Sequence, residues 1–200
     1  MKINSHLFVV ISTALLLSAC TNTNQPKSNE EVLKIDSSAN TTTSVSMKQK
    51  ITPSLWIPTT DAKAAVDYYL SIFKDGKLIE HHKYKNPPEA GGGDFETAIM
   101  EINGVEFSIL AAGPYFKFNE SVSFVINCKD QAEVDYYWQA LTTNGGQESA
   151  CGWCKDKYGL SWQVVPVEYF ELINSKDSLV REKAMVNTLK QKKIILSELK

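Results

Sequence analysis

Apolar and polar residues follow a helical period in two separate stretches of the chain. The first stretch begins after Asp61 and the second after Asp130, and each places its apolar residues three or four positions apart, as on one face of a helix. Both aspartates are predicted N-caps, and Glu133 completes a capping box with Asp130. The predicted helix faces carry Ala62, Ala65, Val66, Tyr69, Leu70 and Phe73 in the first stretch, and Val134, Tyr137, Trp138 and Leu141 in the second.

Short runs of alternating residues before and after each stretch predict β-strands. The pairs Asn103-Gly104 and Tyr158-Gly159 lie where tight hairpins need positive φ angles. Each copy is therefore predicted to be a β-α-β-β-β module. The predicted strands are 54–58, 77–84, 96–102 and 105–110 in the first copy, and 121–127, 147–153, 154–158 and 160–165 in the second.

The two stretches are also similar in sequence. Ser54-Leu-Trp-Ile-Pro-Thr-Thr-Asp61 is echoed by Ser123-Phe-Val-Ile-Asn-Cys-Lys-Asp130, and residues 101–110 are echoed by residues 156–165. Two long copies are too few for a solenoid, so they indicate a tandem duplication of one small module. The predicted fold class is α+β.

This paired module resembles the vicinal-oxygen-chelate superfamily, which includes glyoxalases and bleomycin-resistance proteins. The closest likeness is to its PhnB-like branch, often labelled 3-demethylubiquinone-9 3-methyltransferase. The resemblance implies two tandem βαβββ modules that form a curled mixed sheet around a cleft, usually in a homodimer. It is carried by residues 51–56, 65–73, 113–118 and 151–166, and it predicts modules at 51–113 and 120–166 within a domain at 51–166, followed by a helical extension at 167–200.

The N-terminus has the features of an export signal. Lys2 precedes an apolar run at residues 7–19, which is too short to cross a hydrocarbon core of about 30 Å. Residues 17–20, Leu-Ser-Ala-Cys, resemble a bacterial lipobox, which implies that residues 1–19 are removed and that Cys20 is lipid-modified. An ordinary cleaved signal peptide is the alternative. With Thr21 next, we expect a lipoprotein on the periplasmic face of the outer membrane if the cell is Gram-negative.

Residues 20–50 are rich in Ser, Thr and Asn and have few large apolar residues. Such a segment cannot bury enough surface to fold, so it is predicted to be a flexible tether. Met47 lies where soluble relatives commonly begin, and the sequence leaves open whether it is an alternative cytosolic start.

The net charge of −2 and the sequence pI near 6.0 argue against a general nucleic-acid-binding surface. A basic cluster at Lys190, Lys192 and Lys193 is predicted to be a solvated face of the helix that begins after Asp177.

The resemblance places metal ligands on the first and last strand of each module in metal-dependent relatives. Serine, proline and a single glutamine are poor ligands for a divalent ion, so we predict a metal-free cleft and no cofactor. His81 and His82 are adjacent on a strand and point to opposite faces, so they cannot chelate one ion together. The positions in question hold Ser108 and Gln163, with Pro53 or Ser54 and Ser121 or Ser123 on the first strands.

Strand alternation predicts which residues line the cleft. Leu55, Ile57, Phe124, Ile126 and Trp162 are predicted to face the helices, and residues 116–118 to form part of the rim. A tryptophan, small hydroxyls and an amide suit an uncharged or aromatic organic ligand. The predicted ligand-binding residues are Ser54, Trp56, Ser108, Ser123, Trp153 and Gln163, with Val125 also on the cavity side.

Two familiar chemistries do not fit their sequence context. Cys151 and Cys154 have the thioredoxin spacing but lie in strand-like sequence, where they could still form a disulfide and leave Cys128 unpaired. The glycines at 91–93 lie in a loop between strands, so no glycine-rich strand-to-helix turn supports a methyltransferase.

Two functions therefore remain. The first is a membrane-anchored protein that binds a small organic ligand. The second is a metal-independent enzyme that uses Gln163 with Glu96, Glu101 or Glu106 for acid–base chemistry.

Overall fold

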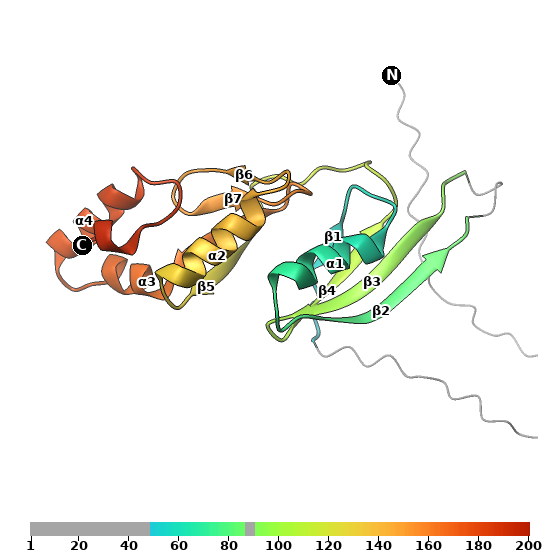
Figure 1. Ribbon diagram of the computed structural model, residues 1–200, viewed down its shortest axis with the longest axis horizontal. Helices are drawn as coiled ribbons and strands as arrows, with labels where there is room; N and C mark the ends of the chain where they lie inside the picture. Colours follow the sequence, from blue (N-terminus) through green and yellow to red (C-terminus); the bar gives the residue numbers. More distant parts are fainter. Residues whose placement is uncertain (1–48, 87–90) are drawn as a thin grey trace, which may run out of the picture. The chain divides into compact units, whose positions relative to one another are not determined.

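The computed structural model describes residues 49–86 and 91–200 (Figure 1). The predicted signal peptide, Cys20, Met47 and nearly all of the tether lie outside these residues. No helix within the described ranges combines the length and the apolar character needed to cross a membrane.

The first module forms a four-stranded mixed sheet with the strand order β1-β4-β3-β2. β1 runs parallel to β4, and the other neighbours are antiparallel. α1 packs on one face of this sheet (Figure 1). The elements are β1 (Ser54–Trp56), α1 (Ala62–Ile72), β2 (Lys77–Tyr84), β3 (Phe95–Ile102) and β4 (Val105–Ala111).

The second module repeats this topology with the order β5-β8-β7-β6. The predicted α+β class and the two βαβββ modules are confirmed. Each module has its own sheet, and neither sheet closes on itself. The elements are β5 (Ser123–Cys128), α2 (Gln131–Thr142), β6 (Gln147–Glu148), β7 (Trp153–Lys155) and β8 (Ser161–Pro166).

The strands predicted at 147–153 and 154–158 are too long. Residues between β6 and β7 turn toward the C-terminal segment instead of continuing the ladder. The Cys151 amide donates to the Gln191 carbonyl at 2.8 Å, and the Gly152 amide donates to the Lys192 carbonyl at 2.7 Å. These long-range bonds follow the early end of β6, whereas β7 ends at Lys155 because the next residue, Asp156, turns the chain by accepting from the Tyr158 amide.

Both helices begin as the sequence predicts. The Asp61 side chain accepts a hydrogen bond from the Ala64 amide at 2.8 Å, and Asp130 accepts one from the Glu133 amide at 2.9 Å. The Glu133 carboxylate accepts from the Lys129 amide at 2.9 Å, one residue before the Asp130 amide that the predicted capping box would use. Side chains therefore satisfy amides that a helix start leaves without intrahelical partners.

A second carboxylate supports the start of α1 from the neighbouring sheet. Glu96 accepts from the Ala62 amide at 3.1 Å, and its oxygens lie 2.8 Å from His81 Nε2 and 2.6 Å from Lys83 Nζ. Lys83, with further hydrogen bonds from His81 and Ala62, lowers the pKa of Glu96 to about 2. His82 instead lies 3.5 Å from Glu80, which agrees with the predicted opposite orientation of the two histidines.

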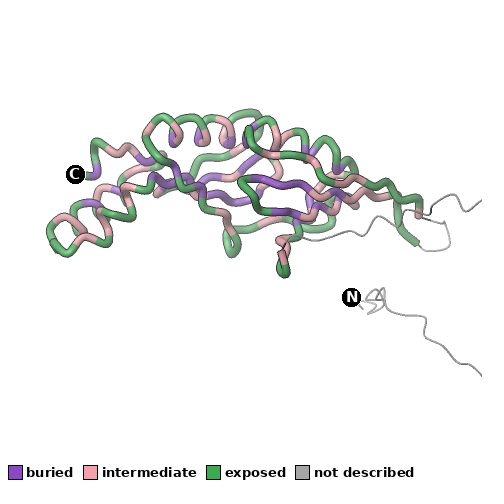
Figure 2. Tube along the Cα trace, turned by 90° about the horizontal axis from the view of Figure 1, so that it is seen from below, coloured by how far each residue is buried: buried purple, intermediate pink, exposed green. Residues whose placement is uncertain are grey.

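One continuous hydrophobic core contains residues of both modules. As predicted, Leu55, Ile57, Ile126 and Trp162 are buried in it. The Trp162 ring lies 5.3 Å from that of Phe73, which follows α1. Figure 2 shows the buried positions concentrated along the strands.

Asp156 links the two modules at the edge of this core. Its Oδ1 accepts from the amides of Tyr158 at 2.9 Å and Leu160 at 3.1 Å. Its Oδ2 accepts from Tyr69 Oη of α1 and from Trp162 Nε1, both at 3.0 Å. Burial raises the pKa of Asp156, and these donors act in the opposite direction. Four donors on two oxygens match an ionised carboxylate.

The C-terminal extension comprises α3 (Val167–Ile173), α4 (Ser178–Thr188) and η2 (Leu196–Glu198), and it forms a small second core around Ile194. α4 begins after Asp177 as predicted, but it ends before the basic cluster. Lys193 lies 2.5 Å from Asp135 on α2, and Lys192 lies 3.5 Å from Glu148. The cluster therefore helps to dock the tail and does not form a helix face.

Replacing Asp156 with Asn should lower the free energy of unfolding by about 2–4 kcal/mol, because an amide nitrogen would face donors and the module link would weaken. Urea denaturation of both proteins measures this difference. Asp67→Asn removes an exposed carboxylate that is paired with Lys63, so it should cost at most about 0.5 kcal/mol. Equal effects of the two substitutions would contradict the role of Asp156.

Replacing Glu96 with Gln should lower stability near neutral pH by about 1 kcal/mol, a figure reduced because Lys83 is exposed and solvent screens the pair. The folded pKa of Glu96 is lowered, so its contribution is complete above the ordinary value of 4.5 and is lost as the pH falls toward about 2.

Thermal unfolding measured from pH 7 to pH 2 should therefore show the wild-type and Glu96→Gln curves converging in acid. Glu171→Gln, at an exposed position of α3, provides the control. A difference that stays constant with pH would show that the ion cluster does not stabilise the start of α1.

Candidate ligand-binding site

The open face of the second sheet, away from α2, carries three of the predicted ligand-binding residues. Trp153 pairs with Gln163 across β7 and β8, while the intervening Cys154 and Trp162 are buried on the helix side. Gln163 Nε2 donates to Ser123 Oγ of β5 at 2.9 Å. The sheet register thus brings Ser123, Trp153 and Gln163 together.

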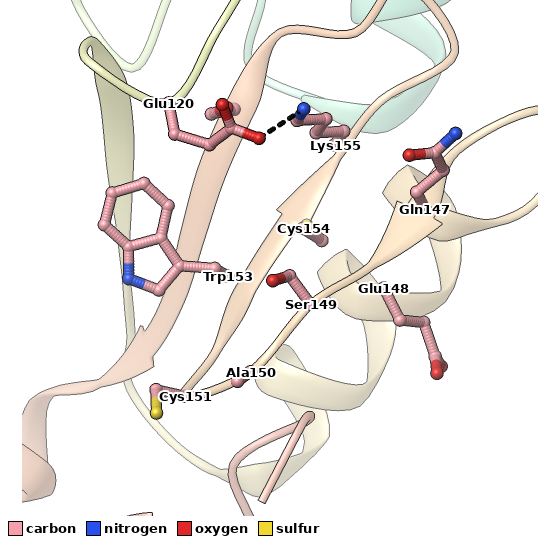
Figure 3. A pocket seen from close by; sticks show the side chains of 10 residues that line it. Glu120, Gln147, Glu148, Ser149, Ala150, Cys151, Trp153, Cys154 and Lys155 are labelled. Carbon is pink, nitrogen blue, oxygen red and sulfur yellow. Dashed lines mark ion pairs between the residues drawn. The ribbon is translucent and has the colours of Figure 1, made fainter. Parts of the chain in front are cut away.

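A cavity of about 410 Å³ lies beside Trp153 on this sheet (Figure 3). Its volume falls in the range of about 300–1,000 Å³ that is usual for small-molecule sites. Glu120 and Lys155 form an ion pair of 2.5 Å at its edge, and Lys155 lowers the pKa of Glu120. Ser161, Gln147 and Ser149 add polar groups to the wall.

Lys155 and Glu120 are not among the residues predicted from the sequence to bind a ligand. Lys155 follows Trp153 by two residues and therefore shares its face of β7, and this spacing was the available signal. Glu120 lies in the segment that connects the modules, where strand alternation gives no guidance.

Two cysteines, Cys151 and Cys154, line this cavity, and Cys128 lies at the end of β5. Cys128, Cys151 and Cys154 are free thiols. Burial raises the pKa of Cys128 and of Cys154 to about 12. These two thiols are therefore neutral at physiological pH and are weak nucleophiles.

The other predicted residues lie on the first module. Ser54 of β1 pairs with Ser108 of β4, and Trp56 pairs with Leu110. Trp56 Nε1 donates to the Gly113 carbonyl at 2.9 Å, and its ring meets Phe116 edge-on at 4.9 Å. The inter-module segment therefore occupies part of the surface of Trp56.

The six predicted residues thus form two groups, with Ser54, Trp56 and Ser108 on one sheet and Ser123, Trp153 and Gln163 on the other. Neither Trp56 nor Gln163 lines the cavity beside Trp153. Their predicted meeting in one shared cavity stays a prediction. Phe116 contacts Trp56, whereas Phe118 packs against the main core and is not a simple rim residue.

Two of the three candidate carboxylates share the open face of the first sheet. Glu101 of β3 lies directly opposite Glu106 of β4, and the two residues are only 8% and 4% exposed. Lys77 Nζ lies 3.3 Å from Glu101. Glu96 instead lies on the helix side of the sheet, where it accepts a hydrogen bond from the Ala62 amide at the start of α1, so it is separate from this pair.

The positions where the family resemblance places metal ligands hold hydroxyls and one amide. Two of them bind each other, since Gln163 Nε2 donates to Ser123 Oγ. Hydroxyls and one amide supply no anionic ligand. Within the described ranges, no group of three or more His, Cys, Asp or Glu side chains is placed to hold a metal ion.

Comparison with known proteins places this fold in a family. Residues 49–165 match the family model described as 3-demethylubiquinone-9 3-methyltransferase. A PhnB protein from Bacillus cereus, described as a putative 3-demethylubiquinone-9 3-methyltransferase, is 27% identical with a TM-score of 0.51, over 59% of this chain and 99% of that chain.

More distant structures are a protein from Pseudomonas aeruginosa, 19% identical with a TM-score of 0.45 over 59% of this chain and 97% of that chain, and a fosfomycin resistance protein from Listeria monocytogenes. The latter is 12% identical with a TM-score of 0.38 over 58% of this chain and 89% of that chain. Both scores are too low to support a functional argument. No curated protein matches the chain. The chain belongs to the 3-demethylubiquinone-9 3-methyltransferase family, in the PhnB-like branch of the vicinal-oxygen-chelate superfamily.

Proposed function

We propose that this protein binds a small organic ligand, uncharged or aromatic, on the open face of its second sheet. The observation that carries the proposal is the cavity of about 410 Å³ beside Trp153. An indole ring next to a cavity of this size provides a flat apolar surface for a ring or an alkyl group.

Neighbouring polar groups would orient such a ligand. Gln163 donates one amide hydrogen to Ser123 and keeps a second hydrogen and its carbonyl oxygen for other contacts. Ser161 and Gln147 lie along the cavity wall. The Lys155–Glu120 ion pair compensates charge at its edge, which suits a neutral ligand.

The proposal includes attachment to a membrane through Cys20, with residues 20–50 as a tether. The lipobox-like sequence at residues 17–20 supports it. It also includes a homodimer and a metal-free cleft without a cofactor, which the family resemblance and the Ser and Gln side chains at the ligand positions support.

The alternative is a metal-independent enzyme, and the opposed carboxylates of Glu101 and Glu106 favour it. Two nearby carboxyl groups can divide the roles of general acid and general base. Both residues lie on the same face of the first sheet as Ser108, so the proposed acid–base site would be on that face. Release of a chemically altered ligand would favour the enzyme. Methyl transfer is not proposed, because no glycine-rich strand-to-helix turn is present in the sequence.

Gln163 lies next to Trp153 on the open face, just outside the cavity wall. Replacing Gln163 with Leu should weaken ligand binding about tenfold, because a ligand that extends past Trp153 would lose its hydrogen bond to this amide. Native mass spectrometry of protein purified from its own cells would first identify a retained ligand, and calorimetry would then compare its affinity for both proteins.

Gln163 is only partly buried, so the change should leave the free energy of unfolding within about 1 kcal/mol of wild type. The matched control is Gln139→Leu on the exposed side of α2. Unchanged affinity in the stably folded Gln163→Leu protein would show that Gln163 does not contact the ligand.

Replacing Cys20 with Ser should abolish incorporation of labelled fatty acid and move the protein from the membrane fraction to the soluble fraction. Stable anchoring needs more than one acyl chain, and all of them depend on this residue in the proposed lipoprotein. Cys128→Ser, a change at a buried thiol, is the control. A wild-type protein that begins at Met47 and is already soluble would contradict the anchor.

A further inference from the structure

A second cavity, of about 340 Å³, lies where the inter-module segment approaches the β7–β8 hairpin. Its wall includes three lysines, Lys117, Lys155 and Lys157. It shares Gln147 and Lys155 with the cavity beside Trp153, so these two residues stand between the two spaces. Figure 3 shows both of them from the side of the first cavity.

The charge around this second cavity is unbalanced. Lys155 is paired with Glu120, but no carboxylate lies within ion-pair distance of Lys117 or Lys157 in the part of the chain that the structure describes. Asp156 also contributes to the wall, yet it is 2% exposed and its oxygens already accept four hydrogen bonds. Among the described residues, Lys117 and Lys157 therefore have no direct ion-pair partner, and the three lysines outnumber the two carboxylates of Asp156 and Glu120.

Lys157 is also held in place. Its Nζ lies 4.3 Å from the centre of the Tyr68 ring and 4.9 Å from that of the Tyr158 ring. The two aromatic faces thus position the ammonium group before any ligand arrives, which lowers the entropic cost of binding.

The remaining wall is largely apolar. We propose that this second cavity binds a small organic oxyanion, a carboxylate or a phosphate, whose charged end meets Lys117 and Lys157 and whose apolar body packs on the rest. This site is distinct from the face that carries Gln163, and it does not depend on the function proposed above. The apolar part of the wall consists of Pro58, Pro114, Phe118 and the ring of Tyr158.

The test measures binding of three probes by calorimetry: phenyl phosphate, benzoate and the neutral benzamide. We expect one or both anions to bind, benzamide not to bind detectably, and the affinity for the anion to fall as salt is raised, since exposed charges are screened. The anion that binds more tightly, phenyl phosphate or benzoate, shows whether the cavity prefers a phosphate or a carboxylate.

Lys157→Met and Lys117→Met each keep an unbranched apolar stem and should weaken anion binding about tenfold, the usual value of one charged hydrogen bond. Lys157→Arg keeps the charge and should retain binding. Lys63→Met, which removes an exposed lysine of α1 that is paired with Asp67, should leave the affinity unchanged.

Gln163→Leu should also leave anion binding unchanged, which separates this site from the one proposed above. Absence of binding by both anions would overturn the inference. Binding that is the same in wild type and in folded Lys117→Met and Lys157→Met proteins, or equal binding of benzamide, would overturn it as well.

Discussion

The arrangement of the second module depends on the buried carboxylate of Asp156. It closes the β7–β8 hairpin through the amides of Tyr158 and Leu160, and it accepts a hydrogen bond from Tyr69 of the first module. A buried carboxylate is costly unless donors surround it, so hairpin and module contact must form together for either to be stable. Because this hairpin sets the register of β7 against β8, Asp156 also determines which side chains reach the open face.

Comparison of the duplicated hairpins explains why that register matters. Glu101 and Asp156 occupy equivalent positions in the repeated sequence. In the first copy, Asn103 and Gly104 form a two-residue turn with φ angles of 48° and 77°, and Glu101 pairs with Glu106 on the open face. In the second copy, the Asp156 amide donates to the Leu160 carbonyl, and Lys155 pairs with Ser161. The pairing of the two strands is therefore shifted by one residue relative to the first copy. A one-residue shift exchanges the two faces of a strand, so Asp156 is buried and Lys155 faces outward.

This shift marks the limit of what the sequence could predict. The helices, their N-caps and the βαβββ order follow from local periodicity and capping, and the structure agrees with them. Both hairpins were expected to be alike, and only the first has positive φ at both central residues. The roles of Lys155 and Asp156 depend on that difference. The shortness of β6 depends on hydrogen bonds from residues 151 and 152 to residues 191 and 192, which no local pattern reveals, and β7 ends where Asp156 begins the turn.

Lys155 connects the hairpin to the chemistry of both cavities. Its pairing with Glu120 leaves the space beside Trp153 with compensated charge at its edge, so apolar contact with Trp153 would dominate recognition there. Gln163 lies next to Trp153 on the same face of the sheet. On the other side of Lys155, the second cavity has Lys117 and Lys157 in its wall. The carboxylate oxygens of Asp156, the acid in this wall, already accept hydrogen bonds from within the protein. Since Asp156 lies between Lys155 and Lys157 in the chain, the buried carboxylate that fixes the hairpin also holds both lysines at the wall of this second cavity. Neutral and anionic groups would therefore be recognised on adjacent surfaces, with Gln147 and Lys155 between them.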